Sequence, residues 1–200
     1  MQLDRVEING RRWYKGPDGK LYPSASSVLD ILFPDSKNWI AEDALVRGTL
    51  CHEEMAKALL SQVTGRNYPQ NDDLQIVHRI RAAMDYLAKF QLETLAIESP
   101  AMIYEVGLTI DYLARETGPD GKSIKHLYDW KFAESVTEQY FFQVELYARA
   151  EEAHKATILQ ITRDGQVFPH RVRPEAERWE KIKSAINVRH FIDRGIKRHV

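Results

Sequence analysis

Hydrophobic residues recur along the chain with two different periods. Intervals of three and four, typical of one face of a helix, mark the segments 22–32, 38–62, 72–93, 134–155 and 174–200. Runs rich in β-branched and aromatic residues, typical of strands, flank Asn9-Gly10 and cover 101–115, 126–132 and 157–172. This pattern predicts one α+β domain, with helices before a hairpin core, a helix after it and a C-terminal helix.

Turn and capping residues mark several of the expected boundaries. Ser24 or Ser26 would cap the first helix, because a serine hydroxyl accepts hydrogen bonds from the free N–H groups of a first turn. Ser135 and Glu138 have the spacing of a capping box at the start of the fourth helix. Gly48 interrupts the second helix and weakens its pattern.

The composition is that of an ordinary globular protein, with 200 residues, 44% hydrophobic and 28% charged, and a net charge of -1. The single cysteine, Cys51, excludes an intramolecular disulfide and a zinc or iron–sulfur site built from several cysteines. This cysteine content suits a reducing cytoplasm. No apolar run is long enough to span a bilayer, so we expect no membrane association. We expect a single domain over 1–200, with its core at about 24–172 and a final helix at about 174–200.

The C-terminal segment is more basic than the rest of the chain. From Arg171 onward there are nine lysines and arginines against four acidic residues. This distribution suggests a local anion-binding face, and the alternative is a solvated helix surface. The cations that would form this face are Lys181, Lys183, Arg189, Arg194, Lys197 and Arg198.

Asp129 and Lys131 stand two residues apart in the apolar run LYDWKF. Residues two apart on a strand point to the same face, so these side chains should emerge side by side. Burial of both charges is costly, but a site for a metal ion and a phosphodiester would explain it. The carboxylate would bind a hard cation, and the lysine would position or deprotonate a water or neutralise the phosphate. The alternative is an exposed edge pair forming a weak surface salt bridge.

Asp111 is a second acid inside an apolar strand. If 101–115 and 126–132 pair as an antiparallel hairpin at the centre of a sheet, Asp111 and Asp129 can lie close together. A divalent ion between the two carboxylates would relieve their repulsion. The alternative is that Asp111 caps a turn or faces solvent.

Residues on two predicted helices could join this site. His52, one turn after Gly48 on a face left open for close approach, is a possible ligand that suits manganese better than calcium. Gln143 and Tyr147 share a helix face, where the amide could donate to a phosphate or base edge and the ring could stack on a base. The alternatives are a structural or exposed histidine, an exposed glutamine and a tyrosine packed in the core.

The order of these residues resembles that of the RecB-type branch of the PD-(D/E)XK nuclease superfamily. It is also similar to phage-encoded exonucleases and to mitochondrial genome maintenance exonuclease. Over about residues 24–150 the chain carries G-x-x-x-H, a strand acid, D-x-K in the next strand and Q-x-x-x-Y on a helix, at Gly48–His52, Asp111, Asp129–Lys131 and Gln143–Tyr147. Each motif is short, and their ordered set is what carries the resemblance.

The resemblance implies a restriction-endonuclease-like core, with a mixed central sheet flanked by helices, and metal-dependent cleavage of DNA. The implied ligands of Mg²⁺ or Mn²⁺ are His52, Asp111, Asp129 and the Trp130 carbonyl. Lys131 would activate or orient the attacking water, and Gln143 and Tyr147 would support the site and contact DNA. Glu98 matches a position where the family often has a glutamate, and we retain it as a further site-supporting or DNA-binding candidate.

The chain also departs from the family pattern. Leu108 stands where the family usually has a glycine three residues before the strand aspartate, and Gly107 comes one residue earlier. Phe132 follows D-x-K, where the family favours threonine or serine. Neither departure removes an expected ligand, but both bear on the geometry of the site.

The function implied is an exonuclease that hydrolyses linear DNA in recombination, repair or phage genome processing, in a bacterial or phage-infected cell. Its partners would be DNA ends, single- or double-stranded, and a helicase or recombination protein, because the chain has no P-loop motif of its own. One alternative is a structure- or sequence-specific endonuclease on the same fold. The other is a non-catalytic nucleic-acid-binding module that retains the nuclease scaffold.

Overall fold

The computed structural model describes residues 3–35, 42–69 and 71–196. Along the chain its elements are β1 (Asp4–Ile8), β2 (Arg11–Lys15), β3 (Leu21–Pro23), α1 (Ala25–Leu32), α2 (Glu42–Thr64), α3 (Leu74–Leu87), β4 (Leu92–Ile103), β5 (Val106–Thr117), β6 (Ser123–Lys131), α4 (Glu138–Ala150), β7 (Lys155–Ile161), β8 (Val167–Val172) and α5 (Ala176–Ile196). Within these ranges, no helix is both long and apolar enough to cross a membrane.

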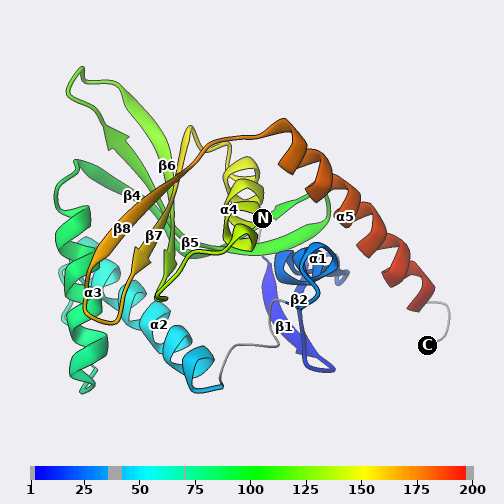
Figure 1. Cartoon of the computed structure of the whole chain (residues 1–200), viewed down its shortest axis with the longest axis horizontal. Coiled ribbons are helices and arrows are strands. Elements are labelled where there is room, and N and C mark those ends of the chain that lie inside the picture. Colours follow the sequence, from blue (N-terminus) through cyan, green and yellow to red (C-terminus); the bar gives the residue numbers. More distant parts are fainter. Residues whose placement is uncertain (1–2, 36–41, 70, 197–200) are drawn as a thin grey trace.

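The central sheet has five strands in the order β4-β5-β6-β7-β8. Neighbouring strands are antiparallel except β6 and β7, which are parallel. The helix α4 provides the crossover connection that a parallel pair needs (Figure 1). The strands β1, β2 and β3 form a second, antiparallel sheet. These observations confirm the α+β class and the mixed central sheet flanked by helices.

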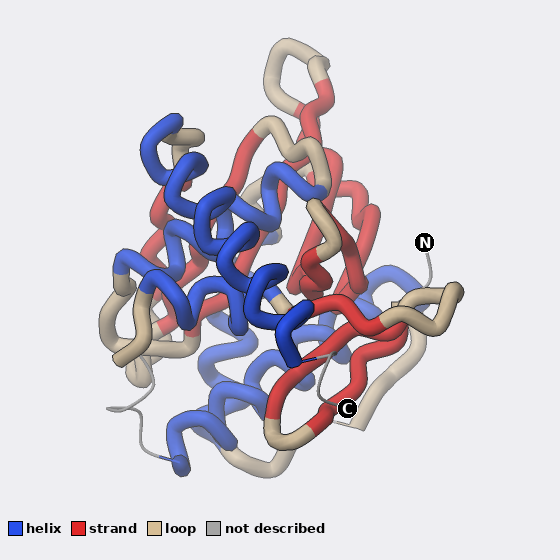
Figure 2. The backbone as a smooth tube through the Cα atoms, turned by 90° about the vertical axis from the view of Figure 1, so that its right-hand side faces the viewer, coloured by secondary structure: helices blue, strands red, loops and turns tan. Residues whose placement is uncertain are grey.

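Alternate residues of the central strands supply two hydrophobic cores on opposite faces of the sheet. Leu127 and Ile158 belong to the core that includes α1, α4 and α5. Their chain neighbours Tyr128 and Leu159 belong to the core that includes α2 and α3. Helices therefore cover both faces of the sheet, as Figures 1 and 2 show.

The small sheet is attached to the central sheet where Tyr14 packs on Gly107. A Cβ atom at Gly107 would lie 2.3 Å from atoms of the Tyr14 ring, so this close approach requires glycine. The Tyr14 hydroxyl also shares a hydrogen bond of 2.7 Å with Thr109 Oγ1. Gly107 thus has a packing role in this chain, four residues before Asp111 on the same strand.

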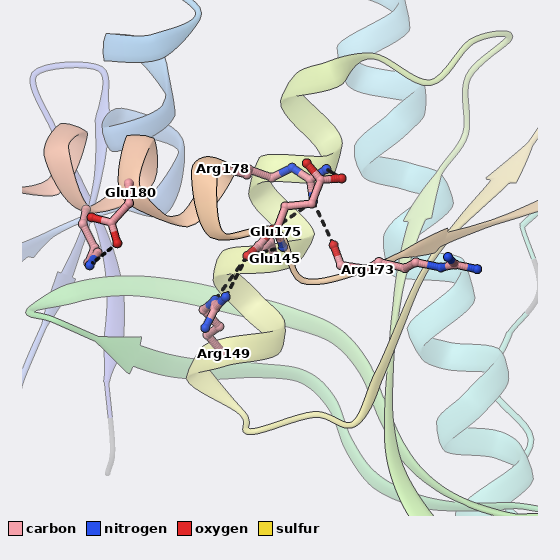
Figure 3. A network of polar contacts seen from close by, with 7 residues as sticks. Glu145, Arg149, Arg173, Glu175, Arg178 and Glu180 are labelled. Carbon is pink, nitrogen blue, oxygen red and sulfur yellow. Dashed lines mark hydrogen bonds and ion pairs between the residues drawn. The ribbon is translucent and has the colours of Figure 1, made fainter.

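A buried carboxylate joins α4 to the start of α5 (Figure 3). Glu145 is 2% exposed, and its oxygens lie 3.0 Å from Arg149 Nη2 and 2.8 Å from Arg178 Nη1. The backbone N–H of Glu175 also donates to Glu145. Two guanidinium groups and an amide thus compensate the buried charge and hold the N-terminal end of α5 against α4.

Several predicted elements and boundaries are confirmed. Ser24 caps α1, since its side chain accepts a hydrogen bond of 3.3 Å from the backbone N–H of Ser27. The hairpins β1–β2, β5–β6 and β7–β8 are antiparallel pairs, as expected. The helix expected at 38–62 runs from Glu42 through Gly48 to Thr64, and 38–41 lie outside the described residues.

Other boundaries were predicted wrongly. The helix expected at 72–93 ends at Leu87, and β4 begins at Leu92. The strand expected at 101–115 is two strands, because Tyr104 and Glu105 form a tight turn with φ of 48° and 57°. Neither residue is a typical turn former, so the sequence gives no turn signal there.

The expected capping box at the start of α4 is also wrong. Thr137 is the N-cap, and its side chain makes no capping hydrogen bond. The helix begins at Glu138, so this residue occupies the first helical position rather than the third, and the box spacing from Ser135 does not apply.

Candidate active site

Glu98 and Asp111 form an acidic pair across β4 and β5. The flanking pairs Ile97↔Tyr112 and Ser99↔Ile110 set the register that places these two residues opposite each other. Like charges directly opposite on neighbouring strands are destabilising. Glu98 also has a φ of 43°, in the left-handed region that non-glycine residues rarely adopt. Repulsion and backbone strain therefore coincide at one point of the sheet, as often happens at functional sites.

His52 approaches this pair from α2. Its Nδ1 lies 3.5 Å from Asp111 Oδ2 and 3.8 Å from Glu98 Oε1. One potential ligand atom from each of the three residues lies within 4.8 Å of the other two. Burial lowers the pKa of His52, but the carboxylates of Asp111 and Glu98 outweigh it and raise that pKa to about 10. The imidazolium thus compensates the acids here, in the place where a divalent cation could do so.

Asp129 and Lys131 lie side by side at the end of β6, as predicted from their spacing. Lys131 Nζ is 2.6 Å from Asp129 Oδ2, and the two side chains are 12% and 0% exposed. The strand is the third of five in the sheet, so the expected alternative of an exposed edge pair is wrong. Apart from this ammonium contact, Asp129 Oδ2 has no hydrogen-bond partner among the described residues.

The environments of the two aspartates shift their pKa values in opposite directions. Burial raises the pKa of Asp129 to about 6, with the charge of Asp111 adding to the effect and that of Lys131 opposing it. Burial also acts to raise the pKa of Asp111, but His52, Lys131 and the Trp130 N–H together lower it. Asp111 is 7% exposed, so the alternative that it faces solvent is wrong.

The two parts of the site are connected by one backbone hydrogen bond. The N–H of Trp130 donates to Asp111 Oδ2 over 2.8 Å, so Asp111 is tied to β6 between Asp129 and Lys131. Antiparallel pairing of β5 with β6 brings these residues together, as the hairpin prediction required. The predicted role of the Trp130 carbonyl as a metal ligand stays a prediction.

Gln143 and Tyr147 reach Asp129 from α4. Gln143 Nε2 donates to Asp129 Oδ1 over 3.5 Å and to the Tyr147 hydroxyl over 3.0 Å. Tyr147 is 7% exposed and packs in the core that includes α1, α4 and α5. This geometry favours the site-supporting role over base stacking, because the ring is covered by protein.

The acidic cluster differs in membership from the one expected from sequence. Glu98, carried as a lesser candidate, groups with His52 and Asp111, whereas Asp129 pairs with Lys131 beside them. The register across β4 and β5 decides this, and it depends on a turn that the sequence does not signal.

One contact of His52 was not foreseen. Phe132, at the family's threonine or serine position, packs edge-on against the His52 ring with centroids 5.7 Å apart. A Cβ atom at Gly48 would meet open space, so the face expected to be open there is not covered by any described residue. Phe132 helps to orient the imidazole, and only the departure from the family pattern at this position could have drawn attention to it.

The predicted basic face of the C-terminal helix is largely neutralised by acids on the same helix. Lys181 pairs with Glu177 at 2.8 Å and Lys183 with Glu180 at 2.7 Å. Arg189 is 6% exposed and pairs with Asp193. The helix packs on α1 and α4, and 197–200 lie outside the described residues. The role of Lys181, Lys183 and Arg189 in DNA binding stays a prediction.

A cavity of about 250 Å³ lies between α2 and α3, away from the acidic cluster. It is lined by residues of α2 such as Glu54, Lys57 and Ser61, whereas His52 points to the sheet from another face of that helix. The cavity shares no lining residue with the site described above. The cavity is therefore separate from the candidate active site.

No protein-family model and no curated protein matches the chain. Among solved structures, the chain is similar to an alkaline exonuclease, LHK-Exo from Laribacter hongkongensis, with 14% identity and a TM-score of 0.45 over 90% of this chain and 95% of that chain. LHK-Exo in complex with dAMP gives the same values. The structure of SSO0001 has 15% identity and a TM-score of 0.32 over 78% and 80% of the two chains.

Proposed function

We propose that this chain is a divalent-metal-dependent DNA nuclease, and that it acts as an exonuclease on linear DNA. The observation that carries the proposal is the convergence of His52, Glu98 and Asp111 within 4.8 Å, next to the buried Asp129–Lys131 pair. A purely structural cluster would not need two acids opposite each other, one of them on a strained backbone.

The residues present fit a hard divalent cation such as Mg²⁺ or Mn²⁺. Carboxylate oxygens are the preferred ligands of both, and an imidazole is compatible with manganese. Glu98 and Asp111 would hold the ion, with His52 as a third ligand once it has lost its proton and Asp129 adjacent. When bound, the ion would polarise a phosphoryl oxygen and lower the pKa of a bound water.

The residues of the chain itself would position and compensate the scissile phosphate. Lys131 places an ammonium beside Asp129, where it can neutralise phosphate charge or orient the attacking water. Gln143 holds Asp129 through its amide, and Trp130 holds Asp111 through its N–H, so both carboxylates keep a fixed orientation. Both aspartates are at most 7% exposed, which strengthens their electrostatic interactions with a bound phosphodiester.

The deciding experiment compares end-labelled linear DNA with a closed circle of the same sequence, in single- and double-stranded forms. Each is incubated with Mg²⁺, Mn²⁺ or EDTA, using wild type, Lys131→Ala and Lys122→Ala. Lys122 has a side chain that is 83% exposed in a turn, so its variant controls for the loss of one lysine. Metal-dependent loss of the linear form alone, absent only in Lys131→Ala, is the expected result.

The other outcomes distinguish the remaining functions. Cutting of the circle would identify an endonuclease. Binding without cleavage in any metal would favour a non-catalytic nucleic-acid-binding module or the need for a partner. The proposed partners are DNA ends and a helicase or recombination protein, and a processive helicase added to duplex substrate would test the latter.

A further inference from the structure

Lys131 has a second neighbour that belongs to none of the sequence motifs. Its Nζ lies 4.8 Å from the centroid of the Tyr140 ring, over the ring face. Tyr140 stands in the first turn of α4 and packs, half-buried, against the hydrophobic core on that face of the sheet. The ammonium is thus held between the Asp129 carboxylate, 2.6 Å away, and an aromatic ring.

The position of Tyr140 on its helix makes this contact part of a larger arrangement. Tyr140, Gln143 and Tyr147 are separated by three and four residues and so share one face of α4. Tyr140 contacts Lys131, Gln143 contacts Asp129, and Tyr147 supports Gln143. One helix face therefore holds both members of the D-x-K pair, and Q-x-x-x-Y is only its second half.

A lysine needs such a restraint more than an aspartate does. Its four-carbon stem has many rotamers, so an unrestrained ammonium samples many positions. A ring face attracts a cation electrostatically, more strongly where water is excluded. Lys131 has a side chain that is 12% exposed, so this attraction is weakly screened.

We propose that Tyr140 is a positioning residue that holds the Lys131 ammonium in its reactive place through a cation–π contact. The inference rests on the proposed nuclease function. This contact is with the face of the Tyr140 ring, so it requires the electron density of the ring and does not require the hydroxyl.

The test compares Tyr140→Phe with Tyr140→Leu in Mn²⁺-dependent cleavage of linear DNA. Tyr140→Phe keeps the ring and is expected to retain wild-type kcat. Tyr140→Leu is expected to lower kcat about five- to tenfold with little change in KM, as the loss of a desolvated cation–π contact implies. Tyr86→Leu is the matched control, because Lys89 lies over the Tyr86 ring at 5.5 Å, away from the site.

A graded series separates this role from simple packing. Phenylalanines carrying one, two and three fluorine atoms at position 140 keep the ring shape but progressively remove its negative face. The logarithm of kcat should fall in proportion to the number of fluorine atoms. Equal kcat across the series, or wild-type kcat in Tyr140→Leu, would overturn the proposal.

A second measurement does not depend on cleavage. With ¹³Cε-labelled lysine and Lys131→Arg for assignment, the Lys131 Hε signal should be shifted upfield by the ring current in wild type and in Tyr140→Phe, and not in Tyr140→Leu. An ordinary shift in wild type would overturn the contact, even in an active nuclease. Absence of cleavage by wild type in every metal would instead overturn the proposed function and the catalytic role with it, leaving only a structural contact.

Discussion

Glu98 and Asp111 face each other across β4 and β5, and His52 Nδ1 lies within 3.8 Å of a carboxylate oxygen of each. The pair is held together by the sheet register rather than by mutual attraction. Without a cation, the imidazolium of His52 provides the compensating charge. The fold therefore keeps the two acids side by side despite their repulsion and despite the left-handed φ at Glu98.

The strain at Glu98 should be measurable as stability. Glu98→Gly and Glu98→Ala both remove the carboxylate, but only glycine adopts a φ of 43° without cost. We expect Glu98→Gly to have a free energy of unfolding about 1–2 kcal/mol higher than Glu98→Ala in urea titrations with EDTA. Mn²⁺ should raise the Tm of wild type and of neither variant, because both lack a ligand. Equal stability of the two variants would remove the argument from strain.

The buried ion pair predicts a different pattern of stability. Lys131→Met leaves the Asp129 carboxylate buried without its ammonium, and should lower the free energy of unfolding by about 3–5 kcal/mol. The double variant Asp129→Asn/Lys131→Met removes both charges and should recover most of that loss. Chemical denaturation of wild type and the two variants measures this, and both variants should fail to cleave DNA. A double variant as unstable as Lys131→Met would show that packing, rather than charge, is responsible.

A polar cluster at the other end of β6 predicts the pH dependence of stability. His126 Nε2 lies 2.8 Å from Thr157 Oγ1, and its Nδ1 contacts Glu116, which also pairs with Lys155. Burial lowers the pKa of His126 below its ordinary 6.5 despite the neighbouring Glu116. Burial raises the pKa of Glu116, but His126 and Lys155 lower it overall.

Both shifts act in the same direction. A group whose pKa is lower in the folded state binds protons more readily when unfolded, so stability falls as pH decreases. His126 should therefore lower the free energy of unfolding as pH falls through 6.5, and Glu116 should lower it again below 4.5. Asp129 acts in the opposite direction below about pH 6, because its pKa is raised in the folded state. His126→Gln should flatten the first drop, and His78→Gln, at an exposed histidine whose Nε2 lies 3.1 Å from the Asp164 carbonyl oxygen, is the matched control. An identical profile for wild type and His126→Gln would contradict this assignment.

The sequence predicted the parts of the site that depend on local spacing. Asp129 and Lys131 share a strand face because they are two apart, and Gln143 and Tyr147 share a helix face because they are four apart. Glu98 is different, because its place beside Asp111 depends on the Tyr104–Glu105 turn, whose residues give no turn signal. Tyr140 was equally hidden, since an aromatic residue at the start of a helix normally reads as core.

Gln160 supplies the last prediction, because it holds the segment that follows Lys131. It is 7% exposed, and the sheet register pairs it with Lys131. Its Nε2 donates to the Ala133 carbonyl over 3.2 Å, and its Oε1 lies 2.8 Å from His170 Nε2. The amide therefore fixes the backbone two residues beyond the catalytic candidate, and His170 fixes the amide.

Gln160→Leu leaves the Ala133 carbonyl and His170 without this partner, which should lower the free energy of unfolding by about 1–3 kcal/mol. It should also lower kcat, because the segment that follows β6 loses this hydrogen bond and Lys131, the last residue of β6, is then less firmly positioned. His170→Phe breaks only the outer contact and should have a smaller effect on both quantities. Urea denaturation and steady-state cleavage of linear DNA measure the two effects in parallel. If His170→Phe lowered kcat more than Gln160→Leu, His170 would have to act on the substrate directly rather than through Gln160.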